Sequence, residues 1–145
     1  MQRQTRYQAA ILENHRILLL RIEEQDDSFW VIPGGGQEDS ESEEECVIRE
    51  VQEETHLQVE VERLIFHDKA RPPDLVYQQY KTYLCRIVGG VARPGVEPEL
   101  GEAESPIKDI GWFDLRAVDS WDWHNSSPSF ALILLKRIRK ELGYE

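Results

Sequence analysis

Apolar and polar positions predict short strands over the first 32 residues of the chain. The segments YQAAILE (7–13) and RILLLRI (16–22) predict two strands joined by a tight turn at Asn14-His15. The second segment is almost continuously apolar, which is typical of a strand in the middle of a sheet. A polar link leads to a third strand, FWVI (29–32), and Pro33 with three glycines then interrupts the pattern.

The periodicity becomes helical over residues 40–55, with Ser40 as the expected N-cap and Glu41 and Glu43 in the first turn. The remaining pattern predicts strands at 57–66, 76–88 and 110–115, a loop rich in Gly, Pro and Glu at 89–108, and an amphipathic helix at 127–142. This order of elements predicts one α/β domain, residues 1–145, in which helices flank a mixed sheet.

Composition narrows the classes of function. The net charge of −11 argues against sequence-independent binding to nucleic acid, which needs a basic surface, but it leaves a nucleotide substrate possible because a metal can reverse the local charge. Cys46 and Cys85 form no metal-type pair and no disulfide framework. With no signal-type or membrane-length apolar run, we expect a soluble protein of the cytoplasm that does not enter a membrane.

The predicted first helix carries a cluster of carboxylates. Glu50, Glu53 and Glu54 stand at positions i, i+3 and i+4, so all three project from one face. On a neighbouring arc, Val47, Ile48 and Val51 are expected to pack against the sheet. Unneutralised, the carboxylates would raise one another's pKa values, and a hard divalent cation such as Mg²⁺ would remove that conflict.

A solvated helix face is the competing interpretation. We assign it to the run Glu43, Glu44 and Glu45, because glutamates at a helix start commonly face water. For the i, i+3, i+4 triplet, the helix alone leaves both interpretations open. Two further features favour a site: the glycine turn lets backbone approach a ligand, and Arg49, two helical turns after Glu41, can hold a carboxylate by paired hydrogen bonds.

With these residues in place, the segment resembles the signature of the Nudix hydrolases, G-x5-E-x7-R-E-U-x-E-E-x-G-U, where U is a bulky apolar residue. The matching positions are Gly35, Glu41, Arg49, Glu50, Val51, Glu53, Glu54 and Leu57. The family's late glycine is His56 here. We expect His56 to be structural, closing the helix in a left-handed conformation at a strain of about 1 kcal/mol.

The resemblance implies a Nudix-type α/β/α sandwich and a metal-dependent pyrophosphohydrolase that uses Mg²⁺, with Mn²⁺ as an alternative. By position, the metal ligands would be the Gly35 carbonyl, Glu50, Glu53 and Glu54, while Arg49 and Glu41 would position those carboxylates. A homodimer is compatible with the resemblance. The general base would be a glutamate of this signature, here called a box glutamate, or one from the later loop. In that loop Glu104 is a candidate together with Glu97, Glu99 and Glu102.

The substrate is left open among several nucleoside diphosphate derivatives. ADP-ribose or a similar nucleotide sugar ranks slightly above nucleoside triphosphates and dinucleoside polyphosphates, because Pro73 stands where an ADP-ribose subgroup resembling this chain has a proline. The alternative function is a catalytically silent Nudix-fold module that binds or senses a nucleotide. Such modules usually lose box glutamates, and this chain retains them.

Overall fold

The computed structural model describes residues 4–70, 76–96 and 105–145. Its elements are β1 (Thr5–Glu13), β2 (Arg16–Glu24), β3 (Asp27–Val31), β4 (Gly34–Gly35), α1 (Glu43–Thr55), β5 (Leu57–Lys69), β6 (Gln79–Gly90), β7 (Ile107–Asp114), the 3₁₀ helix η1 (Val118–Ser120) and α2 (Ser129–Glu141). No helix in the described ranges has the length and apolarity needed to cross a membrane.

The sheet is mixed and branches at its centre. Strands β3, β2, β1, β6 and β5 follow one another across it; β4 also pairs with β1, and β7 also pairs with β2. The β1–β6 ladder is parallel, whereas the other ladders are antiparallel. Strands β1 and β2 pair only near their shared turn, so β1 has a free stretch of edge on which the two residues of β4 are held.

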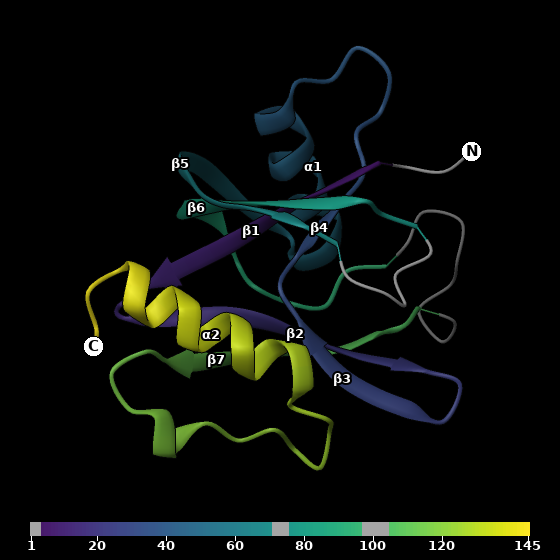
Figure 1. The fold of residues 1–145 in the computed structure, drawn as a ribbon. Helices are drawn as coiled ribbons and strands as arrows, with labels where there is room; N and C mark the ends of the chain where they lie inside the picture. Colours follow the sequence, from purple (N-terminus) through teal and green to yellow (C-terminus); the bar gives the residue numbers. More distant parts are fainter. Residues whose placement is uncertain (1–3, 71–75, 97–104) are drawn as a thin grey trace.

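Alternation along the central strands produces two cores. Side chains of Ala9, Leu18 and Leu20 join the core that contains Val47 and Val51 of α1. Their neighbours on the opposite face, such as Ala10 and Leu19, join the core that contains α2, through residues including Leu135 and Ile138. The two helices therefore cover opposite faces of the sheet, as Figure 1 shows, and the predicted α/β/α sandwich is confirmed.

Helix α1 begins later than predicted. Its N-cap is Ser42, not Ser40, whose φ of 66° places it in the left-handed region. Ser42 and Glu45 form a capping box, in which the Glu45 N–H donates to the Ser42 hydroxyl at 3.1 Å and the Ser42 N–H donates to the Glu45 carboxylate at 2.9 Å. Ser40 could form the same motif with Glu43, but the Glu43 carboxylate is bound by Lys81 and Tyr83.

The other end of α1 confirms the expectation for His56. This residue is the C-cap, with φ 63° and ψ 12° in the left-handed conformation, and its N–H donates to the Gln52 carbonyl. On the sides of the helix, Val47 and Val51 are fully buried as predicted, whereas Ile48 is 39% exposed. The prediction for Ile48 is wrong because Glu50, not Ile48, completes the buried stripe next to the two valines.

Several strand boundaries also differ from prediction. Strand β5 continues to Lys69, and β6 begins at Gln79. Strand β6 reaches Gly90 and β7 begins at Ile107, so both ends of the predicted loop 89–108 are strand. The glycine run is not a complete interruption, because Gly34 and Gly35 pair with Gln8 and Tyr7 of β1. This pairing fixes the turn that precedes α1.

Candidate active site

The glycine turn lies against α1 through Gly35. This residue is buried, and a Cβ atom placed on it would collide with the Glu50 carboxyl group. Glycine is therefore required for the close approach of the turn to that carboxylate. The chain is held there by Arg6, whose guanidinium donates to the Ile32 carbonyl at 3.0 Å and the Gly34 carbonyl at 3.2 Å.

Arg49 is the centre of the charged cluster. Its Nε donates to Oε2 of Glu41 at 2.7 Å and its Nη2 donates to Oε1 of Glu41 at 3.1 Å, a bidentate pair of the kind predicted. Because Glu41 precedes the helix, this pair ties the loop after the glycines to the middle of α1. The Nη2 atom also donates to the Gly36 carbonyl at 3.0 Å, which fixes the glycine run a second time.

The same guanidinium reaches two of the three box glutamates at positions 50, 53 and 54. Its Nη1 donates to Oε1 of Glu50 at 2.9 Å and to the Glu53 carboxylate at 3.2 and 3.3 Å. Glu38 lies further away, with 3.6 Å between its carboxylate and Nη1. One guanidinium thus serves the carboxylates of Glu38, Glu41, Glu50 and Glu53. Arg6 adds a smaller electrostatic attraction to Glu50, so the carboxylates of the cluster still outnumber the cations near them.

The pKa shifts follow from burial and from Arg49. Hydrogen bonding from Arg49 lowers the pKa of Glu41, although partial burial opposes that shift. Burial raises the pKa of Glu50, and Arg49 only partly offsets this effect. The hydrogen bonds to Glu41 are the largest cause of a raised pKa for Arg49, which stays charged. The cluster therefore contains a buried carboxylate whose ionisation the protein alone does not fully support.

Glu54 is held separately from this network, on the same helix. Its Oε1 accepts the Gly34 N–H at 2.9 Å, so its carboxylate is directed at the glycine turn. The Gly35 carbonyl, a predicted metal ligand, faces the Cys46 thiol at 3.8 Å. Burial raises the pKa of Cys46 to about 12, so this side chain is a neutral thiol that packs beneath the turn.

Metal binding can be assessed from the donor set. Across residues 4–70, 76–96 and 105–145, no group of three or more His, Cys, Asp or Glu side chains is arranged to hold a metal ion. The Nη1 atom of Arg49 instead bonds both Glu50 and Glu53. The available donors are nevertheless carboxylate and carbonyl oxygens, one of them a buried carboxylate with a raised pKa. These donor types fit a hard divalent cation.

Some predicted residues lie outside the described part of the chain. They are the later-loop candidates Glu97, Glu99, Glu102 and Glu104, together with Pro73. Trp30 is buried in the core that contains α2, and its indole N–H donates to the Trp123 carbonyl at 2.9 Å. It is therefore a core residue.

Other residues shape the site through backbone contacts or close packing, and the sequence pattern does not predict them. Arg6, Gly34 and Gly36 hold the turn, and no spacing rule predicts these contacts. Gly95 is another example: its N–H donates to the Glu54 carbonyl at 2.8 Å, and a Cβ there would collide with the Glu53 carbonyl. Only the presence of glycine in a Pro-Gly pair marked that position as unusual.

Comparison with known proteins identifies the family to which the chain belongs. A model of the NUDIX domain matches residues 3–132, which is most of the chain. The chain belongs to the Nudix family, as the carboxylate helix and the sandwich together indicate. A Bacillus subtilis (strain 168) protein named "Putative ADP-ribose pyrophosphatase YjhB" is 33% identical over 93 residues, which cover 61% of this chain and 43% of that relative. The chain thus spans less than half the length of this relative.

Solved structures agree on the fold. An ADP-ribose pyrophosphatase from Streptococcus suis 89-1591 superposes with a TM-score of 0.64 at 26% identity, covering 94% of this chain and 92% of that one. A MutT NUDIX hydrolase from Burkholderia pseudomallei gives 0.66 at 25% identity, with coverage of 95% and 99%. A NUDIX hydrolase from Nitrosomonas europaea gives 0.73 at 17% identity, with coverage of 97% and 72%, and at that identity shows the fold alone.

Proposed function

We propose that this chain is a divalent-metal-dependent pyrophosphohydrolase. Its substrate is a nucleoside diphosphate linked to another group, which water cleaves at phosphorus. The observation that carries the proposal is the charge imbalance around Arg49, whose single guanidinium forms ion pairs with several carboxylates. One of these carboxylates belongs to Glu50, a residue that is only 8% exposed. A structural cluster would be balanced, since an uncompensated buried carboxylate is costly.

The proposed metal ligands are Glu50, Glu53, Glu54 and the Gly35 carbonyl. Mg²⁺ or Mn²⁺ bound there would supply positive charge for the diphosphate oxygens and lower the pKa of a bound water. The chain itself orients these ligands: Arg49 and Glu41 fix the carboxylates, and the Gly34 N–H holds Glu54. Hydrolysis at phosphorus depends chiefly on such positioning and charge stabilisation.

A carboxylate must also accept the proton of the attacking water. Glu53 is the box candidate, because its side chain lines an open pocket beside the helix. Glu104 remains the candidate of the later loop, with Glu97, Glu99 and Glu102 as its neighbours in sequence. Replacing each by Gln separates the two assignments, since only the true base should shift the pH profile of turnover.

For the substrate, we propose ADP-ribose or a related nucleotide sugar ahead of nucleoside triphosphates and dinucleoside polyphosphates. Two relatives support this order, since the Bacillus subtilis and Streptococcus suis proteins both carry the name ADP-ribose pyrophosphatase. The match covers only 43% of the Bacillus subtilis protein, and the Streptococcus suis protein is 26% identical to this chain. Direct comparison of substrates is therefore the necessary test.

The test is chromatographic product analysis on a panel of these compounds with Mg²⁺ or Mn²⁺, using the wild type and Glu54→Gln. We expect a nucleoside monophosphate product that disappears in the variant. The alternative function, a silent nucleotide sensor, predicts no product across the panel but a metal-dependent thermal shift with one nucleotide. The absence of both product and thermal shift would reject both functions.

A further inference from the structure

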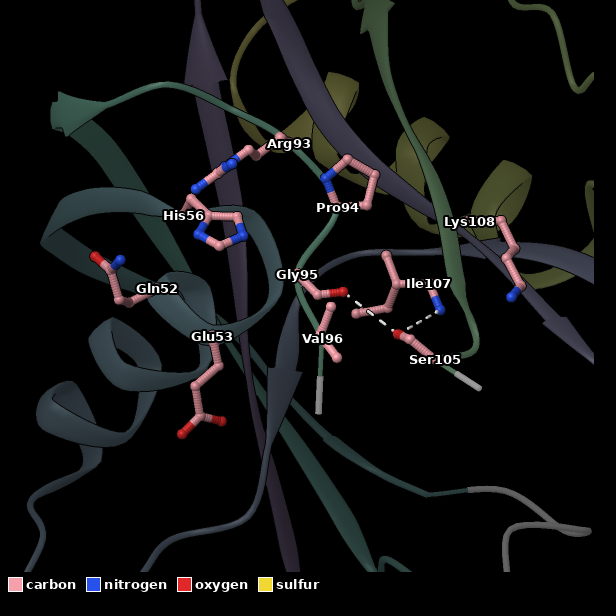
Figure 2. A pocket seen from close by; sticks show the side chains of 10 residues that line it. All are labelled: Gln52, Glu53, His56, Arg93, Pro94, Gly95, Val96, Ser105, Ile107 and Lys108. Carbon is pink, nitrogen blue, oxygen red and sulfur yellow. Dashed lines mark hydrogen bonds between the residues drawn. The ribbon is translucent and has the colours of Figure 1, made fainter. Parts of the chain in front are cut away.

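A pocket of about 720 Å³ lies beside the end of α1 that carries His56. Gln52, Glu53 and His56 form its helical side, residues 93–96 run through its middle, and Ser105, Ile107 and Lys108 form the side at the start of β7, as Figure 2 shows. Glu53 is also a partner of Arg49. The pocket therefore adjoins the proposed diphosphate site and shares one carboxylate with it.

The walls of the pocket are fixed by backbone contacts. The N–H groups of Arg93 and Gly95 donate to the last carbonyls of α1, those of Thr55 at 3.0 Å and Glu54 at 2.8 Å. Across the pocket, the buried Ser105 hydroxyl donates to the Gly95 carbonyl and accepts the Ile107 N–H, both at 3.3 Å. Residues 93–95 are thus attached to both described sides of the pocket.

The polar side chains that line the pocket are mostly basic or neutral. Arg93 is exposed, and within the described part of the chain its guanidinium forms no hydrogen bond or ion pair. Lys108 is a second cation on the far wall. The carboxylate that lines the pocket, Glu53, already accepts from Arg49. Arg93 and Lys108 therefore bring two positive charges to the described lining of this pocket, on a chain whose net charge is −11.

His56 adds a donor that the family signature does not require. Its backbone is in the left-handed conformation, which costs a non-glycine residue free energy that glycine would avoid. The backbone N–H of His56 donates to the Gln52 carbonyl. Its ring lines the pocket, and in Figure 2 the Arg93 side chain extends toward that ring. Among the described residues, the imidazole has no side-chain hydrogen-bond partner.

We propose that this pocket binds an anionic group of the substrate, a phosphate or a carboxylate carried beyond the scissile diphosphate, and that His56 and Arg93 are its specificity residues. The inference rests on the proposed function, because Glu53 links the pocket to the diphosphate site. The imidazole N–H and the guanidinium fork would donate to the same anion, as such groups do in charge-assisted pairs. Lys108 would add charge from the opposite wall.

The test compares substrates that differ only in one anionic group. One pair is ADP-ribose and its 2′-phosphate; the other is UDP-glucose and UDP-glucuronate, which separates a phosphate from a carboxylate. In each pair, the compound with the additional phosphate or carboxylate is called the charged member. We expect the wild type to prefer the charged member of at least one pair. Arg93→Gln should reduce that preference about tenfold, through KM and not kcat, as expected for the loss of one charge-assisted hydrogen bond.

His56→Gly and His56→Asn separate side-chain binding from backbone structure. Glycine relieves the left-handed strain, so His56→Gly should fold at least as stably as the wild type and still lose preference for the charged substrate. Asn also tolerates this conformation and keeps an N–H donor, so His56→Asn should retain part of the preference. Lys136→Gln, an exposed charge on α2 across the sheet, is the control and should leave the preference unchanged.

Thermal shifts with the same four compounds, with and without Mg²⁺, keep this inference distinct from the proposed function. A larger shift for a charged member that falls in Arg93→Gln supports the pocket even where no turnover occurs. Equal shifts and equal kcat/KM within both pairs, or a preference that survives in both Arg93→Gln and His56→Gly, would overturn the inference.

Discussion

Two charged clusters on α1 differ in how their carboxylates are compensated. The N-terminal cluster consists of Glu43, Lys81 and Tyr83: both Glu43 oxygens accept from the Lys81 ammonium at 3.1 Å, and one also accepts the Tyr83 hydroxyl. In this cluster, one carboxylate is hydrogen-bonded to one cation and one neutral donor. The hydrogen bond from Tyr83, followed by Lys81, lowers the pKa of Glu43.

The Arg49 cluster reverses this balance. It comprises Glu41, Arg49, Glu50 and Glu53, so a single cation is divided among several carboxylates. The pKa of Glu50 is raised where that of Glu43 is lowered. The comparison indicates that the first cluster ties α1 to the sheet, whereas the carboxylates of the second outnumber the cations paired with them.

The largest expected effect concerns turnover. Glu53→Gln and Glu54→Gln should each reduce kcat by about 100-fold or more while leaving the melting temperature close to that of the wild type, because transition-state contacts of this kind carry such factors. Glu43→Gln is the matched control from the N-terminal cluster and should retain turnover. Undiminished hydrolysis in both box variants would contradict the metal-site assignment.

The next effect concerns stability. Arg49→Gln removes the cation that is paired with Glu41, Glu50 and Glu53 and should destabilise the fold by about 2 kcal/mol, measured by urea unfolding in EDTA. Mg²⁺ should restore more stability to this variant than to the wild type, because the freed carboxylates can bind it. Arg49→Lys keeps the charge without the fork and should fall between the two. A variant that is equally unstable with and without Mg²⁺ would show that the cluster has no place for a cation.

A smaller effect is expected in the N-terminal cluster. Tyr83→Phe removes one donor to Glu43 while Lys81 remains, so it should cost about 1 kcal/mol, given that the Glu43 side chain is 38% exposed. Mg²⁺ should not change this cost, and kcat should stay at the wild-type value. A Mg²⁺-dependent recovery like that of Arg49→Gln would mean that the two clusters are not different in kind.

Much of the site could be predicted because one helix carries it. The shared face of Glu50, Glu53 and Glu54 follows from helix geometry. The bidentate pair of Arg49 with Glu41 follows from side-chain chemistry, although Glu41 precedes the helix. The sequence could not choose between Ser40 and Ser42 as N-cap. Both have a glutamate three residues later, and the choice depends on Lys81 and Tyr83, which reach Glu43 from β6.

Contacts between distant segments were the other limit of prediction. The glycine turn was expected to be irregular, yet it pairs with β1 because β1 and β2 separate beyond their turn. Nothing near Gly95 in the sequence shows that it lies against the end of α1. The left-handed His56 was predictable from its place in the signature, whereas its neighbour in space, Arg93, was not.

The smallest effect separates the clusters by pH, measured by unfolding in EDTA. Glu43 has a lowered pKa in the fold, so its ionised form stabilises the protein above the ordinary value of 4.5, and this contribution is lost as pH falls through the folded pKa. The stability gap between the wild type and Glu43→Gln should therefore shrink on acidification.

For Glu50, the pH dependence of the stability contribution has the opposite sign. Its pKa is raised, so the folded state binds the proton more tightly than the unfolded state, and stability is lost as pH rises from 4.5 through the folded pKa. The stability of Glu50→Gln relative to the wild type should therefore increase over that range, by at most about 1.4 kcal/mol per pH unit. If both variants drifted in the same direction, the two carboxylates would share one environment, and the contrast between a balanced and an unbalanced cluster would fail.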